Sequence, residues 1–137
     1  MYDEGEGVAQ DYAEAVKWYR KAAEQGDAIA QNNLGAMYDK GKGVTQDYAE
    51  MVKWYRKAAE QGLAVAQFNL GVMYYNGKGV TLDVIAAHMW FNIAAANGST
   101  SAVKNRDIVA GELSSSDIVK AQERAKRCMS SGYKDCD

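Results

Sequence analysis

Apolar and polar residues alternate along most of the chain with the spacing of amphipathic α-helices. Tyr12, Val16, Tyr19 and Ala23 lie at positions i, i+4, i+7 and i+11 and therefore share one helical face, with charged residues on the other side. Similar patterns predict helices over residues 11–25, 27–40, from 47 onwards, 63–76, 83–97, 99–112 and 114–130. No segment alternates with the period of a β-strand, so the pattern predicts seven helices and no strands.

The predicted helix starts carry side chains that satisfy free backbone N–H groups. Asp11 is followed three residues later by Glu14, and Asp47 by Glu50, which resembles a capping box. Ser114 is the expected N-cap of the last helix. Before Asp11, we expect residues 1–10 to form the end of a helix and a loop through Gly5-Glu6-Gly7-Val8.

One segment recurs along the chain with a fixed period of 36 residues. Lys53 to Gly62 is repeated almost letter for letter at Lys17 to Gly26 and, in a more divergent form, at Met89 to Gly98. The residues that keep the same offset include Trp18, Trp54 and Trp90, and Asn33, Asn69 and Asn105. A period in this range is typical of stacked repeat architectures and predicts an all-α solenoid.

We expect the chain to form a single domain over residues 1–137 that is built from repeats. We expect a partial repeat at 1–26, two repeats at 27–62 and 63–98, and a degenerate terminal helix pair with a Cys-bearing tail at 99–137. Met1-Tyr2 aligns with Met37-Tyr38, late in a first helix, so we expect the chain to be part of a longer protein. Any export signal would then lie in the missing part.

The repeated motif resembles the Sel1-like repeat, a relative of the tetratricopeptide repeat. It reads Ala-x-Ala-Gln-x-Asn-Leu-Gly-x-Met-Tyr, then Gly-x-Gly-Val-x-x-Asp, then Trp-Tyr-x-Lys-Ala-Ala-x-x-Gly, in full at residues 28–62 and with changes at 64–98. The resemblance implies a right-handed α/α superhelix whose concave side, lined by the first helix of each repeat, holds partner segments. It also implies adaptors in signalling, protein quality control and bacterial contact with host cells.

A candidate binding surface lies on the face of the 63–76 helix opposite Leu70. Phe68, Val72 and Tyr75 stand there, where the previous repeat has Asn, Ala and Asp, which indicates an apolar anchor in a polar groove. The predicted partner-binding residues are Asn32, Asp39, Phe68, Val72, Tyr75 and Lys104. The alternative is that Phe68 and Tyr75 pack against the adjacent repeat. The repeated asparagines (Asn33, Asn69 and Asn105) either make a structural hydrogen bond within the fold or bind the backbone of a peptide.

Composition narrows the class of partner to protein or peptide. The net charge of −2 and pI near 5.4 argue against nucleic acid and anionic membranes. No apolar run approaches the roughly 20 residues that span a bilayer, so membrane insertion is not expected. His88, the only histidine, has no ligand partners at suitable spacing, so we predict neither metal nor cofactor. The first repeat lacks its front half, so its N-terminal face could stack against a second copy, and a homodimer is a further possible partner.

Two short motifs leave a second function class open. Ser101-Ala-Val-Lys104 and Ser131-Gly-Tyr-Lys134 both match Ser-x-x-Lys, the nucleophile motif of penicillin-recognising enzymes. The resembled family includes cysteine-rich members for which β-lactam binding has been proposed. However, no Ser-Asp-Asn or Lys-Thr-Gly accompanies either match. We therefore predict that the protein is not an enzyme and keep a β-lactam-binding hydrolase as the alternative.

Cys128 and Cys136 are the only cysteines, and they flank a tight tail that contains Gly132. This arrangement favours a disulfide that pins the tail to the last helix over two free thiols. A bridge implies an oxidising compartment, hence a periplasmic or secreted protein, with the cytoplasm as the alternative.

Together these observations predict a non-enzymatic adaptor or scaffold that binds a partner segment on its concave surface. The expected setting is the bacterial envelope or contact with a host. A purely structural segment of a longer solenoid is a further alternative.

Overall fold

The computed structural model describes the backbone of residues 4–137 and the side chains of residues 11–137, and every element in that range is an α-helix. The seven helices are α1 (Glu4–Glu24), α2 (Ala28–Lys40), α3 (Tyr48–Ala59), α4 (Ala64–Asn76), α5 (Val84–Ala96), α6 (Thr100–Ala110) and α7 (Ser115–Ser130). Within the described residues, this confirms the prediction of an all-α chain with seven helices.

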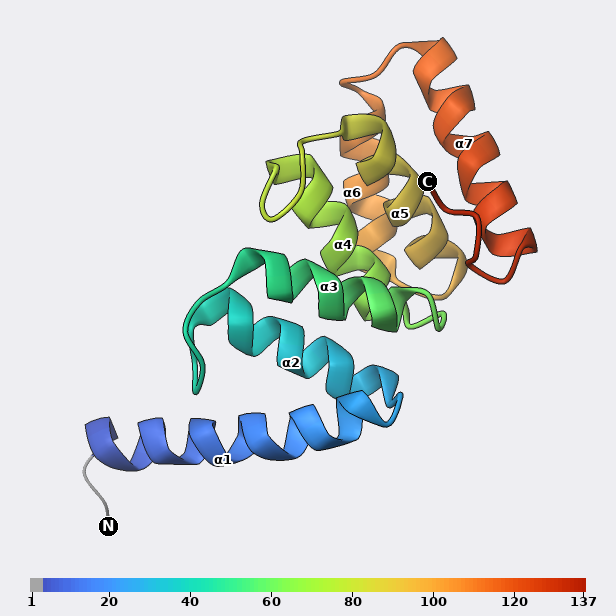
Figure 1. The fold of residues 1–137 in the computed structure, drawn as a ribbon. Helices are drawn as coiled ribbons and strands as arrows, with labels where there is room; N and C mark the ends of the chain where they lie inside the picture. Colours follow the sequence, from blue (N-terminus) through green and yellow to red (C-terminus); the bar gives the residue numbers. More distant parts are fainter. Residues whose placement is uncertain (1–3) are drawn as a thin grey trace.

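The helices form a curved stack in chain order (Figure 1). From α1 to α6, each helix packs against the next one along the chain, and α7 packs against α5. Figure 1 shows α1 at one end of the stack, and α6 and α7 at the other. The repeats therefore bury their apolar faces between neighbours rather than in one central globule.

Side-chain caps fix most of the helix starts that the sequence predicts. Asp47 Oδ1 accepts hydrogen bonds from the N–H groups of Ala49 and Glu50, at 3.0 and 3.1 Å. Ser114 Oγ accepts from Asp117 N at 3.1 Å. The other polar caps are Asp27, Asp83 and Ser99. These short polar side chains replace the intrahelical partners that the first N–H groups lack.

The predicted start of the first helix is wrong. Helix α1 runs without a break from Glu4 to Glu24, so Asp11 lies inside it and the expected loop at Gly5-Glu6-Gly7-Val8 is helical. The corresponding loop after α2 bonds to α2 through Lys42 N and Asp47 N, and the backbone at Gly43 lies against Tyr12 of α1. In α1 the backbone of residues 5–8 continues the helix instead. The expected helix end at Met1–Asp3 lies outside the described residues.

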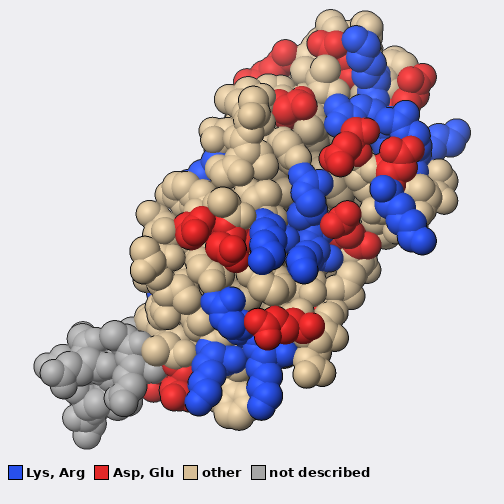
Figure 2. Space-filling view, viewed as in Figure 1, with Lys and Arg blue, Asp and Glu red and all other residues tan. Residues whose placement is uncertain are grey.

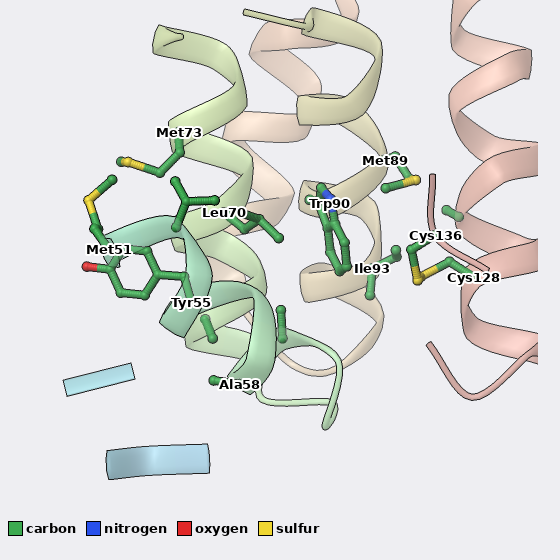
Figure 3. Packing of buried hydrophobic residues seen from close by; sticks show 14 residues of the cluster. Met51, Tyr55, Ala58, Leu70, Met73, Met89, Trp90, Ile93, Cys128 and Cys136 are labelled. Carbon is green, nitrogen blue, oxygen red and sulfur yellow. A yellow bond between two sulfur atoms is a disulfide. The ribbon is translucent and has the colours of Figure 1, made fainter. Parts of the chain in front are cut away.

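Glycines let the two helices of a repeat approach closely. A Cβ atom on Gly71 of α4 would lie 2.7 Å from the ring of Phe91 in α5, and one on Gly35 would lie 2.8 Å from the ring of Tyr55. The main core continues from these contacts through the buried Met51, Leu70, Trp90 and Ile93 (Figure 3). Two smaller clusters lie around Trp54 and around Phe91.

Helix α7 departs from the repeat pattern because it covers α5 rather than α6. The position of Gly35 and Gly71 is Asp107 in α6, where a charged side chain replaces the glycine on which an aromatic ring packs in the earlier repeats. Helix α5 carries Met89 and Ile93 at the positions of Lys53 and Lys57, and both are fully buried. The outer face of α5 is therefore apolar where α7 lies on it.

The C-terminal tail is fastened to the stack at several points. A disulfide joins Cys128 and Cys136 beside Ile93 of α5 (Figure 3). The hydroxyl of Tyr133 accepts a hydrogen bond from Asn97 Nδ2 at 3.0 Å. Arg56 of α3 lies 3.6 Å from the Asp137 carboxylate. The tail thus links the turns that end two different repeats.

Breaking this disulfide lowers stability. We expect the Cys128→Ser/Cys136→Ser variant to unfold with a free energy about 2–3 kcal/mol lower than the wild type, because a short closed loop no longer restricts the unfolded chain. Urea unfolding followed by circular dichroism measures the difference. Adding reductant to the wild type must reproduce the loss and leave the variant unchanged; equal stability with and without reductant would contradict this role.

Candidate functional site

The predicted apolar anchor residues lie along one face of α4 and contact the next helix pair. The rings of Phe68 and Phe91 are tilted against each other with their centroids 5.7 Å apart. Val72 packs between two core clusters. Tyr75 donates a hydrogen bond from its hydroxyl to Glu112 Oε1 at 3.0 Å. All three side chains are half-buried, so each combines packing with an accessible edge.

Two hollows adjoin this face of α4. The larger one has a volume of about 480 Å³ and is lined by Val65, Phe68 and Asn69 of α4, together with Asn97 and residues 98–101. The smaller one has a volume of about 150 Å³ and lies between α4, α5 and α6. Its lining residues are Val72, Tyr75, Phe91, Asn105, Ile108 and Val109. The predicted apolar residues thus border concave surface as well as core.

The polar residues predicted for the same surface are divided between contacts within the chain and solvent. Asn69 Nδ2 donates a hydrogen bond to Asn32 Oδ1 of the preceding repeat at 3.0 Å. Asp39 lies 3.5 Å from Lys78 Nζ. Lys104 is exposed on α6. Asn32 and Asn69 therefore form a polar link between two first helices, next to the apolar stretch on α4.

Carboxylates influence two tyrosines near this surface. Burial, assisted by the negative charge of Asp39, raises the pKa of Tyr55 to about 12. The hydrogen bond to Glu112 raises the pKa of Tyr75 above its usual value. Both hydroxyls are therefore neutral at physiological pH, and Tyr75 keeps the proton that it donates.

Charges of both signs are interspersed on the face shown in Figure 2. Lys and Arg side chains form a band along the molecule, and Asp and Glu side chains lie beside them. Close pairs on α3 and in the tail include Lys53 with Glu50 and Arg127 with Asp135. The band is thus a mixed surface and not a uniformly basic one.

The Ser-x-x-Lys motifs are not built into a catalytic arrangement in the described residues. Ser131 Oγ accepts hydrogen bonds from Lys134 N and Asp135 N, so this hydroxyl holds the turn of the tail. Ser101 and Lys104 are both exposed on α6, and Ser101 borders the larger hollow. A nucleophilic serine requires a base held against its hydroxyl, and the structure shows none at either motif.

His88 is a core residue. Its side chain is 3% exposed, and its Nδ1 has no hydrogen-bond partner within the described chain. Burial lowers the pKa of His88, and the positive charge of Arg106 lowers it further against an opposing effect of Asp107. Elsewhere in the described residues, no group of three His, Cys, Asp or Glu side chains could hold a metal ion. In the same range, no helix combines the length and apolarity needed to cross a membrane.

Several residues of the smaller hollow were missed from the sequence. The predicted set did not include Phe91 and Val109, which line the hollow, or Glu112, which accepts the hydrogen bond of Tyr75, because it followed one face of the first helix of each repeat. A comparison of the repeats offered a signal, since the buried Met73 of α4 corresponds to the shorter Val109 in α6. The replacement of lysines by Met89 and Ile93 likewise indicated that another element covers α5.

A family profile described as the Sel1 repeat matches the sequence three times, at residues 1–27, 28–63 and 64–99. The chain is a Sel1-repeat protein. Among curated proteins, none matches it. The match covers the three copies of the repeated motif and stops close to the start of α6, where Leu and Gly give way to Arg106 and Asp107.

Two solved structures resemble this Sel1-repeat chain along most of its length. One is a protective antigen present in uropathogenic Escherichia coli strains and displaying an SLR fold, at 37% identity over 88% of this chain and 27% of that one, with a TM-score of 0.84. The other is a Sel1 repeat protein from Oxalobacter formigenes, at 43% identity over 70% and 40% of the two chains, with a TM-score of 0.68. The chain therefore spans less than half the length of both and shares their α-solenoid fold.

The buried histidine makes stability depend on pH. The pKa of His88 is lowered in the folded protein, so below about pH 6.5 the unfolded chain takes up a proton that the native state does not. Stability therefore falls as the pH drops through this range. We expect His88→Val, which introduces the residue of the other repeats, to lose less stability than the wild type between pH 7 and 5.

Urea unfolding at both pH values measures this difference. His88→Asn is the matched control, because it stays polar but does not titrate in this range. Parallel losses in all three proteins would show that His88 does not contribute to the acid sensitivity.

Proposed function

We propose that the protein is a non-enzymatic protein–protein interaction module that binds a partner segment on the surface formed by α2, α4 and α6. Sel1-repeat proteins are generally interaction modules, which supports the class. The observation that carries the site is the half-buried apolar face of α4, where Phe68 and Val72 border two hollows. The expected contacts are Asn32, Asp39, Phe68, Val72, Tyr75 and Lys104.

The chemistry of this surface suits a polypeptide. Apolar side chains with free edges stand beside amide groups, so a partner can bury area and also bond its backbone. Asn69 and Asn97 both border the larger hollow. Short segments bind helical grooves in this way because a few anchor residues supply most of the affinity.

The disulfide supports an exported location. Disulfides form and persist mainly in oxidising compartments, so the bond between Cys128 and Cys136 supports the bacterial periplasm or the outside of the cell as the location. The protective antigen from uropathogenic Escherichia coli has the same fold, which is consistent with a role at the cell envelope or in contact with a host.

The exposed ring of Trp18 on α1 supports a further partner, a second copy of the chain. Trp18 is 61% exposed, whereas Trp54 and Trp90, at the same repeat position, are 4% and 1% exposed. Trp54 and Trp90 bury their rings in clusters that include the preceding helices. A helix of a second copy placed against α1 would give Trp18 similar contacts.

Truncating the anchor residues should separate binding from folding. We expect Phe68→Ala/Tyr75→Ala to keep its helical circular dichroism, with a free energy of unfolding lower by about 1–3 kcal/mol, and to lose its partner in a pull-down from envelope extract. The loss follows from removing the two largest side chains of the proposed surface.

The matched control is Val119→Ala, which removes an exposed apolar side chain from α7, a helix that packs on α5. A partner retained by the folded double mutant at Phe68 and Tyr75 would refute the proposed surface. A partner lost equally from both variants would do the same.

Sedimentation velocity of the wild type and Trp18→Ser tests self-association. We expect a concentration-dependent dimer in the wild type and a shift towards monomer in the variant, because Trp18 is the large exposed apolar side chain among the described residues of α1. Thermal unfolding checks that Trp18→Ser remains folded. A wild type that stays monomeric at high concentration would exclude this partner.

A further inference from the structure

Two side chains that line the smaller hollow are smaller than their equivalents in the preceding repeat. Between α2, α3 and α4, the corresponding positions carry the buried Tyr55 and Met73. Between α4, α5 and α6, they carry Phe91, which lacks the hydroxyl, and Val109, which is shorter than methionine. Met73 thus shows that an unbranched apolar side chain fits such a space, and the ring of Tyr55 shows that a flat group does.

The size of the hollow fits a single apolar side chain. Its volume is about 150 Å³, and its walls are mainly Val72, Phe91, Ile108 and Val109. An apolar cavity of about this volume accommodates a benzene ring. A partner can therefore insert one phenyl-sized group, and burying that group supplies most of the binding energy.

Charged side chains stand at both ends of the hollow's edge, which is formed by α6 and the turn that follows it. Lys104 precedes Ile108 by four residues and Glu112 follows it by four, and residues at this spacing along a helix lie in one row. Lys104 and Ile108 are exposed, and Tyr75 holds the Glu112 carboxylate through its hydrogen bond of 3.0 Å. The chain keeps turning past the end of α6, where Glu112 N donates a hydrogen bond to Val109 O at 2.9 Å. The row therefore extends over about 12 Å with a cation at one end and an anion at the other.

An extended polypeptide matches this row. Its side chains point to the same face at every second residue, about 6.7 Å apart, so three alternate side chains cover about 13 Å. An acidic side chain would meet Lys104, an apolar one would enter the hollow, and a basic one would meet Glu112. The charges on the two sides are then complementary, which fixes the register of the segment.

We infer that the hollow between α4, α5 and α6 binds an extended partner segment of the pattern acidic-x-apolar-x-basic, with a phenyl-sized side chain in the centre. This inference rests on the proposed function and specifies the partner that the surface selects. On this inference, Val109, Ile108 and Glu112 determine which partner segment the hollow binds.

The test is a titration of the methyl-labelled protein with the peptide acetyl-Asp-Ser-Phe-Ser-Lys-amide, followed by NMR. A peptide of five residues is too short to form a stable helix in water, so binding reports an extended segment. We expect saturable shifts of the Val72, Ile108 and Val109 methyl signals. Replacing Phe by Ala in the peptide should weaken binding at least tenfold.

Two protein variants separate the hollow from its edge. Val109→Met introduces into the hollow the residue type that Met73 provides at the equivalent position. This variant should weaken binding of the Phe peptide at least tenfold. Glu112→Lys changes an exposed residue, so it leaves the fold intact; it should weaken the same peptide about threefold or more. Glu112→Lys should then prefer a peptide with Asp in place of Lys, whereas the wild type should prefer the original peptide.

Each outcome is decisive for the inference. The inference would be established by methyl shifts that are confined to the hollow and lost in Val109→Met, together with a reversed preference for the charge of the peptide in Glu112→Lys. No shift with any peptide would overturn it, as would binding that ignores both variants. The pull-down with Phe68→Ala/Tyr75→Ala remains independent. A partner captured by the wild type and lost from that variant, without any peptide binding, would support the proposed function and reject this pattern.

Discussion

Close contact between a helix backbone and an aromatic ring sets the geometry of the stack. Gly35 and Gly71 have no side chain, and the rings of Tyr55 and Phe91 occupy the space that a Cβ would need. Because each second helix lies directly on its first helix at this point, the large side chains on either side interlock and exclude water. The buried Leu34 and Leu70, one residue earlier, complete the same contact.

The C-terminal end of the stack follows from the loss of this contact. In α6 the two positions are Arg106 and Asp107, and Arg106 donates a hydrogen bond to Asn92 of α5 at 3.2 Å. Two charged side chains cannot be covered by a packed apolar helix without a large cost of desolvation. Helix α7 therefore packs on the apolar α5, and one side of α6 stays accessible, with the small hollow at its edge.

The features predictable from the sequence are those set by local or repeated interactions. The 36-residue period, the caps at Asp47, Asp83 and Ser114, and the turn in the tail all depend on residues close together in the chain or on identical copies. The start of α1 was mispredicted because the loop of the other repeats depends on contacts with a preceding helix pair. Such contacts join residues far apart in the chain, so the local sequence does not encode them.

The candidate surface was predictable only in part for the same reason. Phe68, Val72 and Tyr75 share one helix, so helical periodicity grouped them. The hollow also needs Phe91 and Val109 from two other helices, and its volume depends on small differences in side-chain size between repeats. Periodicity treats equivalent positions as equal, so it overlooks a cavity that arises because Val109 is smaller than Met73.

The separation between the repeated interfaces and the divergent end makes the length of the array adjustable. Trp54 and Trp90 pack into equivalent clusters, so an added copy of residues 27–62 ahead of residues 63–98 would meet matching surfaces on both sides. Helices α6 and α7 and the disulfide-bonded tail would keep their contacts with the last copy. Gene duplication or deletion of whole repeats can thus change the reach of the solenoid in steps of one helix pair while its terminus stays the same.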